Sequence, residues 1–183
     1  MGLMDVMQKR RAYRSLGPAE INGALVDELA RAASLAASCF NKQPWRFVFA
    51  FDRGVLDGLK EAMNEGNEWT HAASLIVAVC SRRDLDCVVQ GREYYLFDTG
   101  MATACLILRA TEMGLVAHPI AGFDQEKARE VLGIPVDMTL ITLVIVGRHL
   151  LPPNALLSEK QAAIEAQRPE RLPLAEILRR NRF

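Results

Sequence analysis

The sequence predicts a single compact domain that combines helices with buried strands. A chain of 183 residues is long enough to bury a substantial core. Half of its residues are hydrophobic and 24% are charged, proportions typical of a globular protein. Apolar residues recur at helical spacing in some segments and form uninterrupted runs in others, so both kinds of element are expected. We see no repeat or second domain, and residues 1–183 are expected to fold as one unit.

Helical spacing of apolar residues predicts helices over residues 3–9 and 19–36. Asp52 and Asp124 each precede a further short helical pattern. An aspartate oxygen accepts hydrogen bonds from the free N–H groups of a first helical turn, so both are predicted N-caps.

The longest predicted helix spans residues 92–113 and stops at Gly114. It is apolar nearly all round. A helix of this kind lies at the centre of a domain or is covered by a partner subunit.

Extended segments are predicted over residues 47–51, 75–80, 115–121 and 139–147. Residues 75–80 and 139–147 show no apolar–polar alternation, which indicates strands that are buried on both faces.

The chain changes character after Gly147. Residues 149–183 contain four prolines and no obvious strand, yet Leu172, Ile177 and Leu178 lie near the end. Such apolar side chains need a surface to cover, either on their own domain or on a neighbouring subunit.

Charge and composition exclude several classes of partner. Lys and Arg together number 22, and Asp and Glu also number 22, which argues against duplex nucleic acid or an anionic membrane as a partner. The N-terminus lacks a signal-peptide core, and no apolar run reaches membrane-spanning length. The sequence therefore predicts a cytoplasmic protein.

The cysteines Cys39, Cys80, Cys87 and Cys105 form no CxxC pair and no zinc framework. We expect buried free thiols in a reducing compartment. The three histidines are scattered, so no metal site is expected.

Four segments carry chemistry that packing alone does not require. Residues 9–14 form a basic arm whose arginines suit a phosphate, although a solvated charge run is the commoner meaning of such a cluster. Residues 37–47 place Ser, Asn and Gln beside Trp, Arg and Phe, which suits a planar ligand with polar edges or a simple helix-to-strand turn. The third segment is residues 118–123, which could also be a simple strand-to-helix loop. The fourth is the pair Arg168 and Arg171, which could also be solvated surface charge.

Taken together, these segments resemble the nitroreductase family of FMN-dependent oxidoreductases over nearly the whole chain. The motifs that carry the resemblance, in the family's order, are Arg10-Arg11-x-x-Arg14, Ser38-x-x-Asn41-x-Gln43-Pro44-Trp45-Arg46-Phe47, Gly66-Asn67-x-Trp69, Asp98-x-Gly100, Gly114-Leu115, Pro119-Ile120-Ala121-Gly122-Phe123, Leu132-Gly133-Ile134-Pro135 and Arg171-Leu172-Pro173. The run from Asn41 to Trp45 is the most specific of them.

The resemblance implies an α+β fold, a three-layer α/β/α sandwich with a central, mostly antiparallel sheet and a long helix in the core of a dimer. It also implies a homodimer with FMN at the interface and small-molecule substrates. Residues 149–183 would then wrap the partner subunit.

The resemblance also assigns roles to residues. Arg10 and Arg11 would bind the FMN phosphate or ribityl chain, Arg14 would lie near the pyrimidine edge, and Arg171 with Arg168 would complete the phosphate site. A fixed cation near the pyrimidine edge stabilises the negative charge of a reduced flavin.

The partner subunit would supply Ser38, Cys39 and Asn41, and Asn67 would contact the polar edge of the ring. Residues 119–122 would cross one face of the flavin, with an N–H group pointing at N5. The implied cofactor-binding residues are Arg10, Arg11, Ala12, Arg14, Ser38, Cys39, Asn41, Asn67, Pro119, Ile120, Ala121, Gly122, Arg168 and Arg171.

This chain departs from the family in a few places. Ala12 stands where many relatives carry a hydroxyl group, so this chain lacks the side chain that would make one hydrogen bond to the phosphate or ribityl chain. The segment between Cys80 and Tyr94 has no long insertion of the kind that forms a lid, so the site is open or is capped by another element.

The implied function is hydride transfer from NADH or NADPH through FMN to a nitroaromatic, a quinone or an enone, in a ping-pong cycle without a catalytic side chain. The alternatives are a specialised flavoenzyme for dehalogenation or flavin breakdown, and a non-catalytic flavin-binding or redox-sensing protein.

Overall fold

A computed structural model describes residues 2–183. Its centre is a five-stranded sheet in which every pair is antiparallel. The strands are β1 (Leu16–Gly17), β2 (Trp45–Ala50), β3 (Leu75–Ser81), β4 (Val116–Ile120) and β5 (Thr139–His149). β5 pairs with β1, β3 and β4, and β3 pairs with β2.

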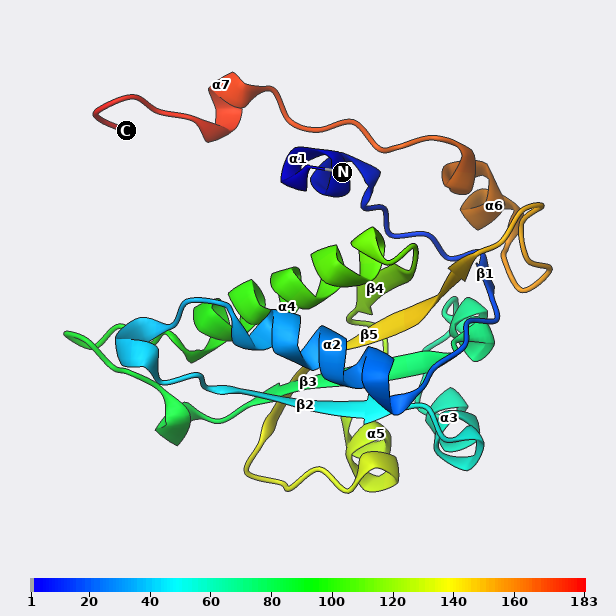
Figure 1. The fold of residues 1–183 in the computed structure, drawn as a ribbon, viewed down its shortest axis with the longest axis horizontal. Coiled ribbons are helices and arrows are strands. Elements are labelled where there is room, and N and C mark those ends of the chain that lie inside the picture. Colours follow the sequence, from blue (N-terminus) through cyan, green and yellow to red (C-terminus); the bar gives the residue numbers. More distant parts are fainter. Residues whose placement is uncertain (1) are drawn as a thin grey trace.

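Helices cover both faces of the sheet (Figure 1). The α-helices are α1 (Leu3–Lys9), α2 (Gly23–Ser34), α3 (Arg53–Lys60), α4 (Tyr95–Glu112), α5 (Gln125–Leu132), α6 (Glu159–Ala166) and α7 (Leu174–Ile177). Three 3-10 turns complete the elements, η1 (Cys39–Asn41), η2 (Glu68–Ala72) and η3 (Arg83–Leu85). α2 and α4 lie on one face and α3 and α5 on the other, which confirms the three-layer sandwich with an antiparallel sheet.

β3 shows why the two layers form. All of its residues are buried. Val77 and Val79 pack with α2 and α4, whereas Ala78 and Cys80 pack on the side of α3 and α5. Successive side chains of a strand point to opposite faces, so a strand without polar residues requires a helical layer on each side.

The predicted helices are confirmed, with shifted ends. α2 begins at Gly23 because the side chain of Asn22 accepts a hydrogen bond from the N–H of Leu25 (3.0 Å) and caps the helix. α4 begins at Tyr95 because Val89 and Arg92 exchange backbone hydrogen bonds in a tight turn. Gly114 ends α4 with φ of +78°, a conformation that favours glycine.

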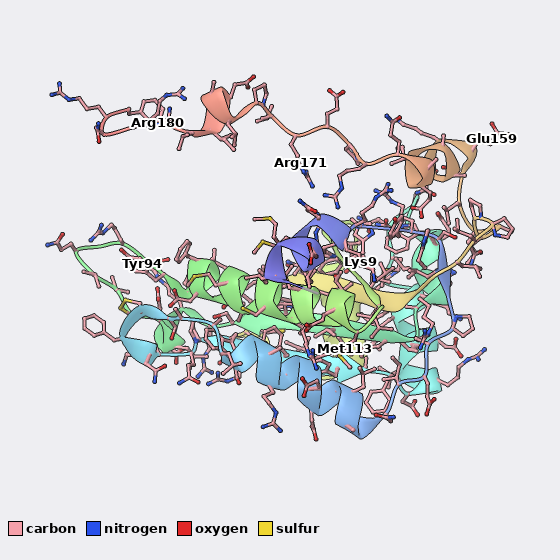
Figure 2. All side chains as sticks on the ribbon, turned by 45° about the horizontal axis from the view of Figure 1, so that its top comes forward. Lys9, Tyr94, Met113, Glu159, Arg171 and Arg180 are labelled. Atoms are coloured by element: carbon pink, nitrogen blue, oxygen red, sulfur yellow. A yellow bond between two sulfur atoms is a disulfide. The ribbon has the colours of Figure 1, made fainter. Side chains whose placement is uncertain are left out.

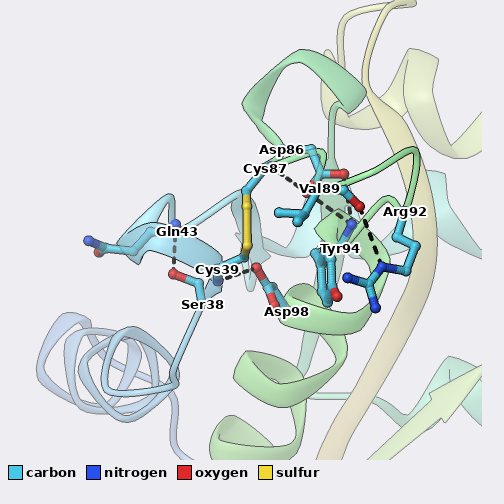
Figure 3. Close-up of a disulfide and its surroundings, with 9 residues drawn as sticks. All are labelled: Ser38, Cys39, Gln43, Asp86, Cys87, Val89, Arg92, Tyr94 and Asp98. Carbon is cyan, nitrogen blue, oxygen red and sulfur yellow. Dashed lines mark hydrogen bonds between the residues drawn. A yellow bond between two sulfur atoms is a disulfide. The ribbon is translucent and has the colours of Figure 1, made fainter.

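The expectation of four free thiols is wrong for two of them. A disulfide joins Cys39 to Cys87 and ties η1 to the segment between β3 and α4 (Figure 3). Oδ2 of Asp98 on α4 accepts a hydrogen bond from the backbone N–H of Cys39 (2.9 Å) and holds the same turn. Cys80 and Cys105 are free. The expectation of a reducing compartment loses the support that it drew from four thiols.

The tail leaves the sheet after β5 and passes back over the N-terminal segment. α6 lies near β1, and α7 lies apart from the helical layers (Figure 1). The apolar side chains of Leu172, Leu174 and Ile177 are about two-thirds exposed, at 63%, 70% and 66%. None of the helices in residues 2–183 combines the length and the apolar character that crossing a membrane takes.

The cap of α5 offers a test of this local structure. Oδ1 of Asp124 accepts hydrogen bonds from the N–H groups of Glu126 (3.0 Å) and Lys127 (3.1 Å). We expect Asp124→Ala to lower the free energy of unfolding by about 1 kcal/mol, because these donors lose their acceptor. Asp124→Asn keeps an acceptor oxygen and serves as the control. Equal stability of the two variants in urea denaturation would contradict the assignment.

Candidate functional site

Six of the predicted site residues line a cavity of about 530 Å³ between the two ends of the chain. One wall is the basic arm between α1 and β1, and the other is the end of α6 with the residues after it. Figure 2 shows Arg171 extending from the tail toward the N-terminal segment. The lining residues are Arg10, Arg11, Ala12, Arg14, Ile164, Glu165, Arg168, Pro169 and Arg171.

Side-chain hydrogen bonds to backbone carbonyls hold the two walls together. The guanidinium of Arg168 donates to the carbonyl of Arg10 (2.8 Å) and also to that of Gln8. The guanidinium of Arg11 donates to the carbonyl of Gln167 (2.8 Å). Arg11 and Arg168 therefore build the cavity by joining segments from opposite ends of the sequence.

The remaining arginines carry charge without a partner. Within residues 2–183, the side chains of Arg10, Arg14 and Arg171 make no hydrogen bond and no ion pair. Burial lowers the pKa of Arg10, and the neighbouring cations Arg168 and Arg171 lower it further. Crowded cations of this kind are stabilised by an anion, and guanidinium groups match the oxygens of a phosphate.

A second cavity of about 240 Å³ adjoins the first, because Arg14 lines both. Its other walls come from η2 and from the end of β4 with the turn that follows it. The lining residues are Arg14, Asn67, Trp69, His118, Pro119, Ile120, Ala121 and Gly122. The structure thus brings the predicted segments around residues 10–14, 67, 119–122 and 168–171 together.

Asn67 is fixed at both ends of its amide. Its Nδ2 donates to the carbonyl of Gly122 (2.7 Å), and its Oδ1 accepts from Nε1 of Trp69 (3.1 Å). A Cβ added at Gly122 would lie 2.5 Å from Nδ2 of Asn67, closer than the two atoms can approach. Glycine at this position is therefore what allows the turn and Asn67 to form one wall.

His118 lines the second cavity, although only its segment, and no role for its side chain, was predicted from the sequence. It is buried, its ring stacks on Trp69 with centroids 4.7 Å apart, and its Nδ1 lies 3.0 Å from the carbonyl of Tyr13. A carbonyl only accepts, so Nδ1 carries the hydrogen. Burial is the largest cause that lowers the pKa of His118. The only signal in the sequence was its place beside Pro119.

Sequence reasoning missed Glu165. It is 6% exposed, it lines the arginine cavity, and its Oε1 accepts a hydrogen bond from the backbone N–H of Arg14 (2.7 Å). Its Oε2 lies 3.4 Å from Nε2 of His149. Nothing in the proline-rich sequence of the tail marks a glutamate as buried.

The segment from Ser38 to Asn41 does not join the other predicted residues within one chain. Neither cavity includes it, and it lies at the N-terminal end of α4, where Cys39 contacts Asp98. The basic arm lies at the other end of α4, since Arg11 and Thr111 line one pocket. At a rise of about 1.5 Å per residue, α4 separates the two places by about 20 Å.

The backbone of this segment is unusual. Phe40, Asn41 and Gln43 have φ of +47°, +56° and +48°, which few residues other than glycine adopt. Phe40 is 82% exposed. Strained backbone conformations cluster at binding and active sites, which makes this segment a candidate for one.

Comparisons with known proteins agree with the resemblance in the sequence. Residues 7–148 match the model of the nitroreductase family. A putative NADH dehydrogenase/NAD(P)H nitroreductase of Archaeoglobus fulgidus is 28% identical over 148 residues, which cover 79% of this chain and 83% of that protein.

Solved structures share the fold. A crystal structure described as an oxidoreductase containing FMN has a TM-score of 0.84 and 28% identity, and the match covers 97% of this chain and 91% of that one. A putative nitroreductase of Exiguobacterium sibiricum in complex with FMN has a TM-score of 0.80 and 19% identity, with 99% and 98% covered, and shows a likeness of fold. The family model covers well over half of the sequence, and the second cavity and the basic arm fall within the matched region. This chain therefore belongs to the nitroreductase family.

Proposed function

We propose that this enzyme holds FMN and transfers hydride from NADH or NADPH through it to a small acceptor, a nitroaromatic, a quinone or an enone, in a ping-pong cycle. The observation that carries the proposal is the arginine cavity joined through Arg14 to the wall made by Asn67 and Gly122. Two structural relatives are described as containing FMN, and the Archaeoglobus relative is named for NAD(P)H.

The arginine cavity fits the phosphate end of FMN. Within residues 2–183, the side chains of Arg10 and Arg171 form no ion pair, and Arg168 lies beside them. A phosphate bound there would receive charge-assisted hydrogen bonds from planar donors, and it would relieve the repulsion among the guanidinium groups.

The second cavity fits the ring end. Its wall offers backbone groups of residues 119–122, and glycine at 122 lets a flat ligand approach closely. The amide of Asn67 would meet the polar edge of the ring, and Arg14, which lines both cavities, would put a cation between ring and phosphate. FMN supplies the hydride chemistry when it is bound, so the protein has to bind, orient and polarise it.

We further propose that the site is complete only in a homodimer. Ser38, Cys39 and Asn41 lie about 20 Å of helix away from the arginines of their own chain. They can share a ligand with arginines only across a subunit boundary. Exposed Phe97 on α4, at 63%, and the exposed apolar side chains of residues 149–183 support an interface of this kind, with the tail wrapping the partner.

We place the enzyme in the cytoplasm, where NAD(P)H is available to it. Disulfides are rare in that compartment, so the state of Cys39 and Cys87 in cells bears on this part of the proposal.

The proposed reaction is tested with the purified protein. We expect it to bind added FMN and to oxidise NADH or NADPH when an acceptor is present. Anaerobic reduction of the bound flavin by NAD(P)H at the rate of turnover separates an oxidoreductase from a flavin carrier or sensor. A protein that takes up no FMN and oxidises neither nucleotide would overturn the proposal.

Removal of one free cation tests the phosphate end. We expect Arg10→Ala to weaken FMN binding by about one to two decades, because a hydrogen bond to a charged group is worth roughly 1.5–3 kcal/mol. Quenching of flavin fluorescence measures the dissociation constant. Arg31→Ala, which removes an exposed arginine on α2, is the control and leaves the affinity unchanged. Equal affinities of the two variants would remove Arg10 from the phosphate site.

The ring end is tested at Gly122. We expect Gly122→Ala to weaken FMN binding, since the added methyl group displaces the amide of Asn67. Gly23→Ala is the matched control, because a Cβ at Gly23 has no atom within 4 Å. Wild-type affinity in Gly122→Ala, with a melting temperature like that of the control, would contradict this wall.

Mixing of subunits tests the shared site. We expect Arg10→Ala and Asn41→Ala to weaken FMN binding as separate homodimers. When the two are coexpressed with different tags and the heterodimer is purified, one of its two sites carries neither substitution. Tight binding at half of the sites is the expected result. Weak binding at every site of the heterodimer would show that each site belongs to a single chain.

A further inference from the structure

A buried carboxylate stands in a cavity that is otherwise cationic. Glu165 is 6% exposed and shares the cavity with Arg10, Arg11, Arg14 and the two arginines of the tail. A carboxylate repels a phosphate, so it weakens the anion binding for which the arginines are suited. A buried charge is also costly unless it is paired and hydrogen-bonded. Its presence therefore calls for a role other than binding the phosphate.

The contacts of Glu165 connect it to the part of the site nearest the ring. Its Oε1 accepts from the backbone N–H of Arg14 (2.7 Å), and Arg14 is the residue that lines both cavities. Its Oε2 faces Nε2 of His149 at 3.4 Å. The ring of His149 stacks on that of Tyr13 with centroids 3.7 Å apart. The guanidinium of Arg11 lies over the ring of Tyr13, 4.5 Å from its centroid. Glu165 thus contacts both the arm and the end of β5, and the contact with the arm is a hydrogen bond.

The charge of Glu165 reaches the second cavity. It raises the pKa of His118, whereas Arg14 and Arg10 lower it, so all three charges act at a residue of the ring-side wall. Any negative charge that develops on a ligand there is attracted by the arginines and repelled by Glu165.

We propose that Glu165 is a positioning residue that fixes Arg14 and sets the net positive charge around the flavin. This inference rests on the proposed function. A reduced flavin is more negative than an oxidised one, so an excess of cations stabilises the reduced form. The midpoint potential then rises, and the reduced flavin becomes a weaker hydride donor. By offsetting one cation, Glu165 keeps the flavin reducing enough to pass hydride on to an acceptor.

The expected effect follows from Coulomb's law. A unit charge that acts over about 10 Å, at an effective dielectric constant of about 20, changes the relative affinity for two forms that differ by one charge by about tenfold. For a two-electron couple, a tenfold change corresponds to a shift of about 30 mV in the midpoint potential.

The experiment compares the FMN-loaded wild type with Glu165→Gln. The amide oxygen of glutamine still accepts from the N–H of Arg14, so the substitution removes the charge and keeps the hydrogen bond. Anaerobic equilibration with a reference dye at pH 8 gives the midpoint potential. We expect it to rise by about 30 mV, with reduced FMN bound about tenfold more tightly relative to oxidised FMN. Loss of packing alone weakens both forms and does not move their ratio in this direction.

Glu159→Gln is the matched control. Glu159 is an exposed glutamate at the start of α6 and lines neither cavity, so the same change of charge there leaves the potential unchanged. His149→Lys is a second variant that places an ammonium opposite Oε2 of Glu165 and offsets its charge without removing it. It raises the potential in the same direction and serves if Glu165→Gln does not fold.

The outcomes separate the two proposals. An unchanged or lowered potential in FMN-loaded Glu165→Gln, or in His149→Lys if the first variant does not fold, overturns the role of Glu165 and leaves the proposed function standing. Failure of the wild type to bind FMN overturns the proposed function, and this role falls with it.

Discussion

β5 pairs with three other strands, and each of these pairings brings one part of the site to its place. β1 pairs with the last residues of β5, where Leu16 lies opposite His149, so the basic arm before β1 runs beside the start of the tail. β4 pairs with the middle of β5 and delivers the turn at residues 119–122. Ser74, just after η2, donates from its N–H to the carbonyl of Val146, which places Asn67 next to that turn.

The middle of β5 is also completely shielded from solvent. Leu143, Val144, Ile145 and Val146 are fully buried, at 0% exposed, between the two helical layers. Burial of such side chains supplies most of the free energy that folding needs. The arginines lie in segments that flank this sheet, and the sheet itself is held by contacts that do not depend on charge.

The sequence was most informative where the signal is local. Asp52, Asp124 and Gly114 mark helix ends through the geometry of a single turn, and the apolar run of β3 marks a strand between two layers. The arm, Asn67 and the turn at 119–122 followed from motifs, and the structure brings them into adjoining cavities. What could not be read depends on distant pairing. Cys39 meets Cys87 across 48 residues, and Glu165 meets Arg14 across 151, with no pattern in either segment to announce it.

The arginine cavity joins residues that are nearly the whole chain apart, since the bond from Arg168 to the carbonyl of Arg10 spans 158 positions. During synthesis, the arm emerges from the ribosome early and can form the cavity only after the tail has been made. Closure of so long a loop has an entropic cost that only the finished sheet can offset. Under the proposed function, binding of FMN is consequently among the last events in the maturation of the chain. A ligand that binds in this cavity also stabilises the contact between the two ends of the chain, because it binds only to chains in which that contact has formed.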